Sequence, residues 1–471
     1  MLKTKLKYTT FAIAVTMMGS IAAADGHSAM NYGQFPVTVK GYTGDATNSV
    51  SYSGQIARHV LHDSLKVLAG RGDGGANSSA LKAEMLSYFS GSEKNKAILA
   101  PGSKDEFIIK QGTLNEISSG KNIEGKFYNG PMLAWPGSMK GREVALHMID
   151  RASTANKGVD AENGYNWPQL ISKFTMGAMA YSQAVDNYLD EKLDAGTKPN
   201  NKPYKDGKHY TGKEHVWDEG FGYFGAAAHT LSLTADQAYG IAKRKDMASA
   251  DANGDGLVDL KSEMVFGPAY YAAAFDRSGS KSTNYLNNIM KAYVDGRMVI
   301  TSADGAILTD GQRQEIKNYA SVIESNWEQV LAEAVFKYAG SAYKDISKVQ
   351  EDGADQAKAY NAYVKHWGEL KGFSMALQSG RNNLGETAGT MNDLILFGPV
   401  TLDNSYVTSV TSNGDFKREK RMTWSDYQLN LLKVQKLMVD KFGIKALVNN
   451  KLGDIAALAG KLGDASSAET D

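Results

Sequence analysis

Residues 166–193, NWPQLISKFTMGAMAYSQAVDNYLDEKL, decide the fold class. Apolar side chains recur along this stretch at helical spacing, which predicts one long amphipathic helix. Asn166 is a suitable N-terminal cap, and Pro168 falls in the first turn, where its missing backbone N–H is tolerated. The apolar positions are Trp167, Leu170, Ile171, Phe174, Tyr181, Val185, Tyr188 and Leu189.

A second stripe with the same period lies in the C-terminal part of the chain. It comprises Ile316, Tyr319, Ile323, Trp327, Val330, Leu331, Ala334 and Tyr338. Pattern and length favour helical bundles over a sheet, so we expect a mainly α fold. The polar break FDRSGSKSTN separates two helical halves, at 54–280 and 281–463. We expect a short extended segment at 25–53 and a disordered tail at 464–471.

The first residues predict export. Lys3, Lys5 and Lys7 precede the apolar run FAIAVTMMGSIAAA, which ends in small residues. This is typical of a signal peptide at 1–24 that is cleaved after Ala24. No later stretch reaches the ~20 consecutive apolar residues of a membrane-spanning helix. We therefore expect a periplasmic protein that does not span the membrane, with secretion or surface attachment as alternatives.

Composition excludes several classes of protein. The chain has no cysteine, which excludes disulfides and thiolate metal ligands. Three of its 52 basic residues lie in the expected signal peptide, so 49 remain against 52 acidic side chains. This balance argues against nucleic acid as a partner.

The segment DANGDGLVDLKSE, residues 251–263, resembles an EF-hand calcium loop. Its oxygen ligands would be Asp251, Asn253, Asp255, the carbonyl of Leu257, Asp259 and Glu263. Gly256 falls where the loop must turn sharply. Ser262 occupies the position of the usual bidentate glutamate, and Glu263 comes one residue later. We expect a structural calcium site here; the alternative is an acidic surface turn.

Helical projection of the segment that begins KEHVWDEGFGYFG, residues 213–225, gives two faces. Trp217, Phe221 and Phe224 share an apolar stripe that we expect to face the core. His215 and Glu219 lie on the opposite side with Gly222, and Asp218 lies beside them. Because glycine inside a helix costs ~1 kcal/mol, Gly222 indicates that a ligand or another backbone comes close.

A second cluster occurs in YVKHWGELKGFSMALQ. His366 and Glu369 lie among large apolar side chains, so they must be paired, shifted in pKa or bound to metal. We predict that His215, Asp218, Glu219, His366 and Glu369 form one site for iron or another transition metal. A satisfied buried histidine is the structural alternative for each cluster. His59 and His62, beside Asp63, are interpreted as part of a solvated helix face.

Three stretches, SYSGQIARHVLHDSL, HVWDEGFGYFG and HWGELKGFSMALQ, resemble an exported bacterial family, domain of unknown function 4856. That family is similar to imelysin-like proteins, which are helical periplasmic proteins associated with iron uptake. The resemblance implies a double helical bundle and a His-x-x-Glu metal motif. His366 and Glu369 match that motif, whereas the earlier cluster has Asp218 in the place of the glutamate.

Three functions follow as hypotheses. The favoured one is metal handling, which implies a metal ion and an outer-membrane or periplasmic uptake partner. The second is a metal-dependent hydrolase with Glu219 or Glu369 as the base. The third is a calcium-stabilised interaction protein that presents the aromatic loop KFYNGPMLAWPG, residues 126–137, to a partner.

Overall fold

The computed structural model describes residues 31–278, 283–353, 355–381 and 384–468, and within these ranges it is mainly helical. The expected signal peptide lies outside the described residues. The α-helices are α1 (Ser53–Ala69), α2 (Ser78–Phe89), α3 (Gly141–Thr154), α4 (Trp167–Thr175), α5 (Gly212–Phe224), α6 (Ala235–Ala242), α7 (Met247–Ala250), α8 (Gly267–Ser278), α9 (Tyr285–Ser302), α10 (Asp310–Val349), α11 (Gln356–Gln378), α12 (Glu386–Ile395), α13 (Trp424–Phe442) and α14 (Ile455–Ala468).

The stretch at 166–193 begins as predicted. The Asn166 side chain accepts a hydrogen bond from the Gln169 amide, and Pro168 lies in the first turn. After Thr175 the α-helix passes into two π-helical segments, η3 (Met176–Tyr181) and η4 (Gln183–Tyr188). A β-carbon at Gly177 would come within 2.3 Å of Ala376 on α11. Glycine therefore lets α11 pack closely against this widened helix.

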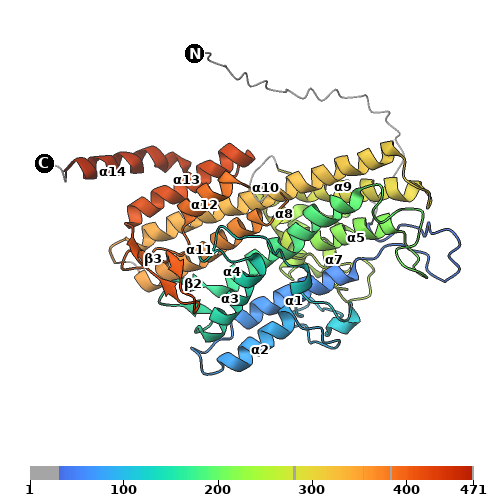
Figure 1. The fold of residues 1–471 in the computed structure, drawn as a ribbon, viewed down its shortest axis with the longest axis horizontal. Coiled ribbons are helices and arrows are strands. Elements are labelled where there is room, and N and C mark those ends of the chain that lie inside the picture. The colour runs from blue at the N-terminus through green and yellow to red at the C-terminus, as the bar shows by residue number, and fades with distance from the viewer. Residues whose placement is uncertain (1–30, 279–282, 354, 382–383, 469–471) are drawn as a thin grey trace, which may run out of the picture.

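The long helix α10 forms the centre of the bundle. Thr309 and Gln312 form a capping box at its N-terminus, and it packs against α9, α11 and α13. Figure 1 shows the long helices side by side, with α1 and α2 on the lower side and α13 and α14 at the upper left. No helix in the described ranges is both long and apolar enough to cross a membrane.

The expected boundary near residue 280 adjoins 279–282, which are outside the described residues. Helices from the two sides pack directly, since α11 contacts α4 and α9 contacts α5. One continuous hydrophobic cluster includes side chains from both expected halves. The core is therefore shared across the expected boundary.

Strands are short in the described part of the chain. Three antiparallel pairs form: β1 (Val159–Asp160) with β2 (Tyr165–Asn166), β3 (Ser405–Tyr406) with β6 (Lys420–Arg421), and β4 (Ser409–Val410) with β5 (Phe416–Lys417). Residues 31–52 contain no named strand, and a single bridge joins Pro36 to Asn48. The tail expected to be disordered from 464 is helical as far as Ala468, because α14 continues to that residue.

Candidate functional site

A large pocket lies where five helices converge. It encloses about 780 Å³ between α1, α4, α8, α10 and α11, and it is open to solvent. The end of α6 and the Ala100–Pro101 loop complete its wall. Met176, where α4 becomes π-helical, also lines the pocket. π-Helical segments occur frequently at functional sites.

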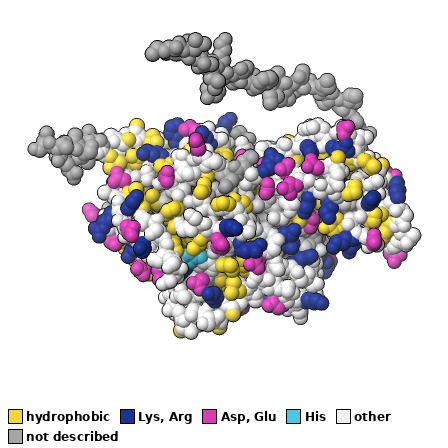
Figure 2. Space-filling view, viewed as in Figure 1, with side chains coloured by type: hydrophobic (Ala, Val, Ile, Leu, Met, Phe, Trp, Pro, Cys, Tyr) yellow, Lys and Arg dark blue, Asp and Glu magenta, His cyan; other side chains and the backbone are white. Residues whose placement is uncertain are grey.

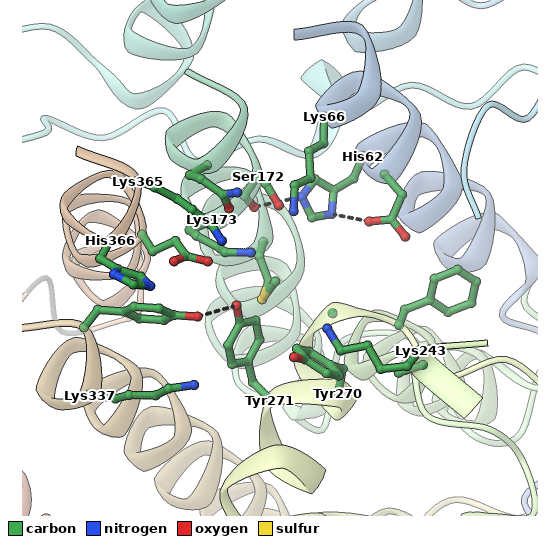
Figure 3. Close-up of a pocket in the computed structure, with 18 of the residues that line it drawn as sticks. His62, Lys66, Ser172, Lys173, Lys243, Tyr270, Tyr271, Lys337, Lys365 and His366 are labelled. Carbon is green, nitrogen blue, oxygen red and sulfur yellow. Dashed lines mark hydrogen bonds and ion pairs between the residues drawn. The ribbon is translucent and has the colours of Figure 1, made fainter. Parts of the chain in front are cut away.

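The pocket wall is rich in basic side chains. Arg244 and seven lysines line it against three carboxylates, Asp63, Asp345 and Glu369. Figure 3 shows labelled lysines converging from separate helices. On the face of the molecule in Figure 2, basic and acidic side chains are intermixed. The lysines are Lys66, Lys173, Lys243, Lys337, Lys344, Lys348 and Lys365.

Among the described residues, the seven pocket lysines have no carboxylate within ion-pair distance, although Asp63 and Glu369 lie near enough to act on Lys173. In the described part of the chain, none forms an ion pair or donates a hydrogen bond to the protein. Some lysines outside the pocket do form ion pairs, as Lys317 does with Asp194 at 2.8 Å. Among the pocket carboxylates, Asp345 Oδ2 lies 2.5 Å from His366 Nδ1. Asp63 Oδ1 lies 3.8 Å from Nδ1 of His62, whose buried ring is neutral at pH 7. The pocket therefore carries a net positive charge.

Lys173 is the most enclosed of these lysines. Only 5 % of it is exposed, and its Nζ lies 5.3 Å from the ring centre of Tyr271 and 5.9 Å from that of Phe373. Burial, with a smaller contribution from Lys66, lowers the pKa of Lys173 to about 7, and the nearby Glu369 acts in the opposite direction. Its amine is thus divided between the charged and neutral forms near neutral pH.

Tyrosine hydroxyls add further hydrogen-bond donors. The hydroxyls of Tyr271 and Tyr338 lie 3.3 Å apart, and burial raises the pKa of both well above the ordinary value. They remain protonated at neutral pH and can donate to an anion. Opposite them, His62 is buried against the Ser172 carbonyl, with Nε2 2.8 Å from that oxygen. Both His59 and His62 are 1 % exposed, so interpreting them as a solvated face was wrong.

The five residues predicted to share a metal site do not line one cavity. His366 and Glu369 line the pocket, whereas His215, Asp218 and Glu219 on α5 do not. His215 Nε2 lies 3.8 Å from Glu219 Oε2, and Glu219 Oε1 accepts a hydrogen bond from Gln55 at 2.8 Å. Within the described ranges, no group of three or more His, Asp or Glu side chains is arranged to hold a metal ion.

Asp218 belongs to a buried ion network. Its carboxylate accepts hydrogen bonds from Arg297 Nε at 2.9 Å and from the Tyr32 hydroxyl at 3.0 Å. Arg297 Nη1 also lies 3.1 Å from Glu214, and all three charged side chains are fully buried. The network joins α5 and α9 to the N-terminal segment, so Asp218 is structural here.

The helical projection of α5 was otherwise accurate. Trp217, Phe221 and Phe224 are fully buried in the core. A β-carbon on Gly222 would lie 2.8 Å from the β-carbons of Tyr52 and Gln55, so the predicted close approach is that of neighbouring protein. The interaction loop at 126–137 does not present its aromatic residues as expected: Phe127 and Trp135 are buried.

The EF-hand-like loop has a backbone folded around its own side chains. Asp251 accepts hydrogen bonds from the amides of Gly254, Asp255 and Gly256. The Glu263 carboxylate turns back to the loop and accepts from the Asp259 amide at 2.7 Å. The carboxylate oxygens of Asp251 and Glu263 therefore accept hydrogen bonds from backbone N–H groups. Among the described residues, the acidic side chains of this loop are not grouped in threes or more in an arrangement that could hold a metal ion. Calcium binding here stays a prediction.

A further contact fixes this loop on the protein. Val258 pairs with the segment around Ile109: its amide donates to the Ile108 carbonyl, and its carbonyl accepts from the Lys110 amide. Lys110 Nζ lies 3.3 Å from Asp255. The loop is therefore held in place by protein groups.

The sequence analysis missed the pocket lysines. They come from separate helices, and no local motif unites them. One partial signal exists, because Lys337, Lys344 and Lys348 recur at seven and four residues on α10 and so share a helix face.

These features define a mainly helical protein with an open, positively charged pocket between its helices. A family model described as Domain of unknown function (DUF4856) matches residues 148–388. Because this match spans more than half of the 471 residues, the chain belongs to that family. The matched range contains the pocket side chains of α4, α8, α10 and α11. No curated protein and no solved structure matches the chain. The relationship to imelysin-like proteins stays a prediction.

Proposed function

We propose that this protein binds a small polyanion, a molecule with several carboxylate or phosphate groups, in the central pocket. The observation that carries the proposal is a set of seven lysines around one cavity, none of which forms an ion pair among the described residues, against three carboxylates in the same wall. Like charges gathered in a partly enclosed space repel one another, and a multiply charged anion would relieve that repulsion. The volume of about 780 Å³ is that of a small-molecule site.

The donor chemistry supports this ligand class. Ammonium groups and protonated tyrosine hydroxyls surround the cavity, and both donate hydrogen bonds to anionic oxygens. Glu369 and Asp345 would orient the ligand by repelling its carboxylates from one side of the wall.

Export stays part of the proposal. The basic and apolar leader-like sequence at 1–24 supports a periplasmic location, where the protein would capture its ligand.

Metal handling remains as a narrower proposal. A metal ion held by a polycarboxylate chelator would arrive as a negatively charged complex, and the lysines could bind that complex through the chelator's oxygens. Calorimetry with iron(III) citrate and with citrate alone compares the two forms. Tighter binding of the iron complex would favour metal handling, and tighter binding of citrate would favour the free anion.

Calorimetric titration of the purified chain with citrate and with inorganic phosphate tests the main proposal. We expect citrate to bind, and to bind more weakly as salt rises from about 50 to 500 mM, because ions screen the pocket. Lys66→Met and Lys337→Met should each weaken binding by about 1–2 kcal/mol, or roughly 5- to 30-fold in Kd, since each removes a charged donor.

Lys291→Met is the matched control. Lys291 lies on α9 and forms an ion pair with Asp295 at 2.8 Å, outside the pocket. Its replacement should leave the Kd unchanged. Absence of binding by both probes at millimolar concentration, or equal weakening by Lys291→Met, would refute the proposal.

A further inference from the structure

We infer that Lys173 is a covalent site, whose amine forms an imine with the carbonyl group of an anionic aldehyde or α-keto acid held in the pocket. This inference rests on the proposed function, because the surrounding lysines supply the affinity for the anionic group. It adds a chemical requirement on the ligand, namely a reactive carbonyl beside a carboxylate or phosphate.

A comparison of buried lysines singles out Lys173. Lys213 and Lys371 are also buried, and both have structural partners. Lys213 Nζ donates to three backbone carbonyls at 2.7–2.8 Å, and Lys371 Nζ donates to Asn392 Oδ1 at 3.0 Å and to the Leu396 carbonyl. Lys173 donates to no protein acceptor in the described part of the chain. Its side chain extends into the cavity instead (Figure 3).

The surroundings of Lys173 suit a nucleophilic amine. The aromatic faces of Tyr271 and Phe373 flank the end of the side chain, with ring centres 5.3 and 5.9 Å from Nζ. Burial and the neighbouring Lys66 disfavour the ammonium form, so a large share of the amine is neutral near pH 7. Desolvation and a nearby cation are the two means by which proteins activate lysine for imine formation.

Groups on several elements face this amine and set its charge. Lys66 on α1 and Lys243 after α6 disfavour the charged form, whereas Asp63 on α1 and Glu369 on α11 favour it. The hydroxyl of Tyr271 on α8 lies on the same wall. Burial raises the pKa of Asp63 to about 6, so this carboxyl can give or take a proton near neutral pH.

The reaction balances without an oxidant or reductant. The lone pair of the neutral amine attacks the carbonyl carbon, a C–N bond forms, and the carbonyl π electrons pass to oxygen. A proton moves from nitrogen to that oxygen and gives a carbinolamine. Loss of the hydroxyl with a further proton releases water, and the nitrogen lone pair completes the C=N bond. The product is the imine of Lys173 plus one water molecule.

Reductive trapping tests the inference. The purified chain is incubated at pH 7 with glyoxylate, an anionic aldehyde, and with cyanoborohydride, and the modified lysines are mapped by peptide mass spectrometry. An unperturbed lysine of pKa about 10.4 is only ~0.04 % neutral at this pH. With its pKa near 7, Lys173 should carry at least 10-fold more adduct than Lys344 and Lys365, which are exposed lysines of the same pocket.

Two variants keep the test independent of folding. Lys173→Met should abolish the major adduct and melt at or above the temperature of the wild type, because it removes an unpartnered buried amine. Lys371→Met should melt lower, because it leaves the Leu396 carbonyl without its donor. Equal labelling of Lys173, Lys344 and Lys365, or an unchanged adduct pattern in Lys173→Met, would overturn the inference.

Citrate, which has no aldehyde or ketone, separates the inference from the proposed function. If citrate binds and Lys173 is not labelled preferentially, the covalent inference fails and anion binding stands. If Lys173 is labelled preferentially and citrate neither binds nor protects it, the amine is reactive and the polyanion proposal fails. Preferential labelling that citrate suppresses supports both.

Discussion

Replacing Arg297 by methionine should destabilise the fold strongly. Arg297 is fully buried, with Nε 2.9 Å from Asp218 Oδ1 and Nη1 3.1 Å from Glu214 Oε1. Its guanidinium also donates to the hydroxyls of Ser49 and Thr301. Methionine would retain much of the packing against Phe35, whose ring centre lies 4.8 Å from the guanidinium carbon. The variant therefore tests mainly the charge.

The expected loss of unfolding free energy at pH 7 is about 3–5 kcal/mol, the cost of breaking a buried ion pair and leaving its partner charged. Typical domains have ~5–15 kcal/mol in total, so the loss is a large fraction of the stability. Because two carboxylates, Asp218 and Glu214, would lose their partner, we expect a loss near the upper end of this range. Protonation of Asp218 would reduce the loss. Burial already raises the pKa of Asp218 to about 6 with Arg297 present, and removing the arginine raises it further.

The sign of the pH dependence follows from this shift. The folded-state pKa of Asp218 lies above the unfolded value, so the folded protein binds the proton more tightly. Arg297 lowers the pKa of Asp218, so this pKa is higher in Arg297→Met than in the wild type. The penalty of Arg297→Met should therefore shrink as the pH falls from 7 towards 6, by up to ~1.4 kcal/mol per pH unit for this carboxyl. It should level off below about pH 6, where Asp218 of the wild type also takes up the proton.

Urea unfolding of both proteins at pH 7, 6 and 5 measures the effect. Lys40→Met is the control, because Lys40 and its partner Asp304 are 66 % and 75 % exposed and their pair should add little. Asp218→Asn combined with Arg297→Met should recover part of the loss, because it removes one uncompensated charge. A loss below about 1 kcal/mol at pH 7, or a penalty that grows at pH 5, would refute the ion-network interpretation of Asp218.

Three further predictions concern other parts of the molecule. Calcium should raise the melting temperature, and Asp251→Ala combined with Asp255→Ala should abolish the rise; melting curves unaffected by calcium or a chelator would contradict the site. Gly177→Val should unfold the chain or lower its melting temperature by many degrees, because its β-carbon would lie 2.3 Å from Ala376. In contrast, Gly389→Ala on α12, with nothing within 4 Å, should gain roughly 0.5–1 kcal/mol of stability. Similar melting shifts for the two variants would contradict the close packing of η3 against α11. Burial lowers the pKa of His62 to about 3, below the unfolded value of about 6.5. The free energy of unfolding should therefore decrease as the pH falls through this interval, because the unfolded state binds the proton more tightly. His62→Gln should make the free energy of unfolding, measured with urea, less dependent on pH between pH 6 and 4, by up to ~1.4 kcal/mol per pH unit. An unchanged pH dependence would show that His62 is not buried in its neutral form.

Much of the local structure could be predicted because it depends on neighbours in sequence. The cap at Asn166, the helix through Trp327 and the buried stripe of Trp217 and Phe221 follow from spacing and side-chain type. The Asp, Asn and Gly residues of the loop at 251–263 likewise predict a tight turn, and its backbone amides donate to the Asp251 side chain. The family resemblance was confirmed on residues 148–388.

The partners of the charged residues could not be predicted in the same way. The sequence neighbours of Asp218, His215 and Glu219, are residue types that suit a metal site. The residue that neutralises Asp218 is Arg297, which lies 79 positions away in the sequence. His366 and Glu369 both line the pocket, and the partner of His366 is Asp345 on the preceding helix. Helix packing brings these residues together, and a helical projection of one segment contains no information about that packing.

The sequence by itself determined a mainly helical chain, the apolar faces of its helices and several of their ends, because backbone hydrogen bonding and side-chain periodicity act over a few residues. Only the tertiary structure decided that Lys66, Lys173 and Lys337, from three separate helices, line one cavity and form no ion pair with any described residue. Electrostatic energy depends on distance and burial in space. The charge of the pocket therefore emerged only when α1, α4 and α10 were packed together.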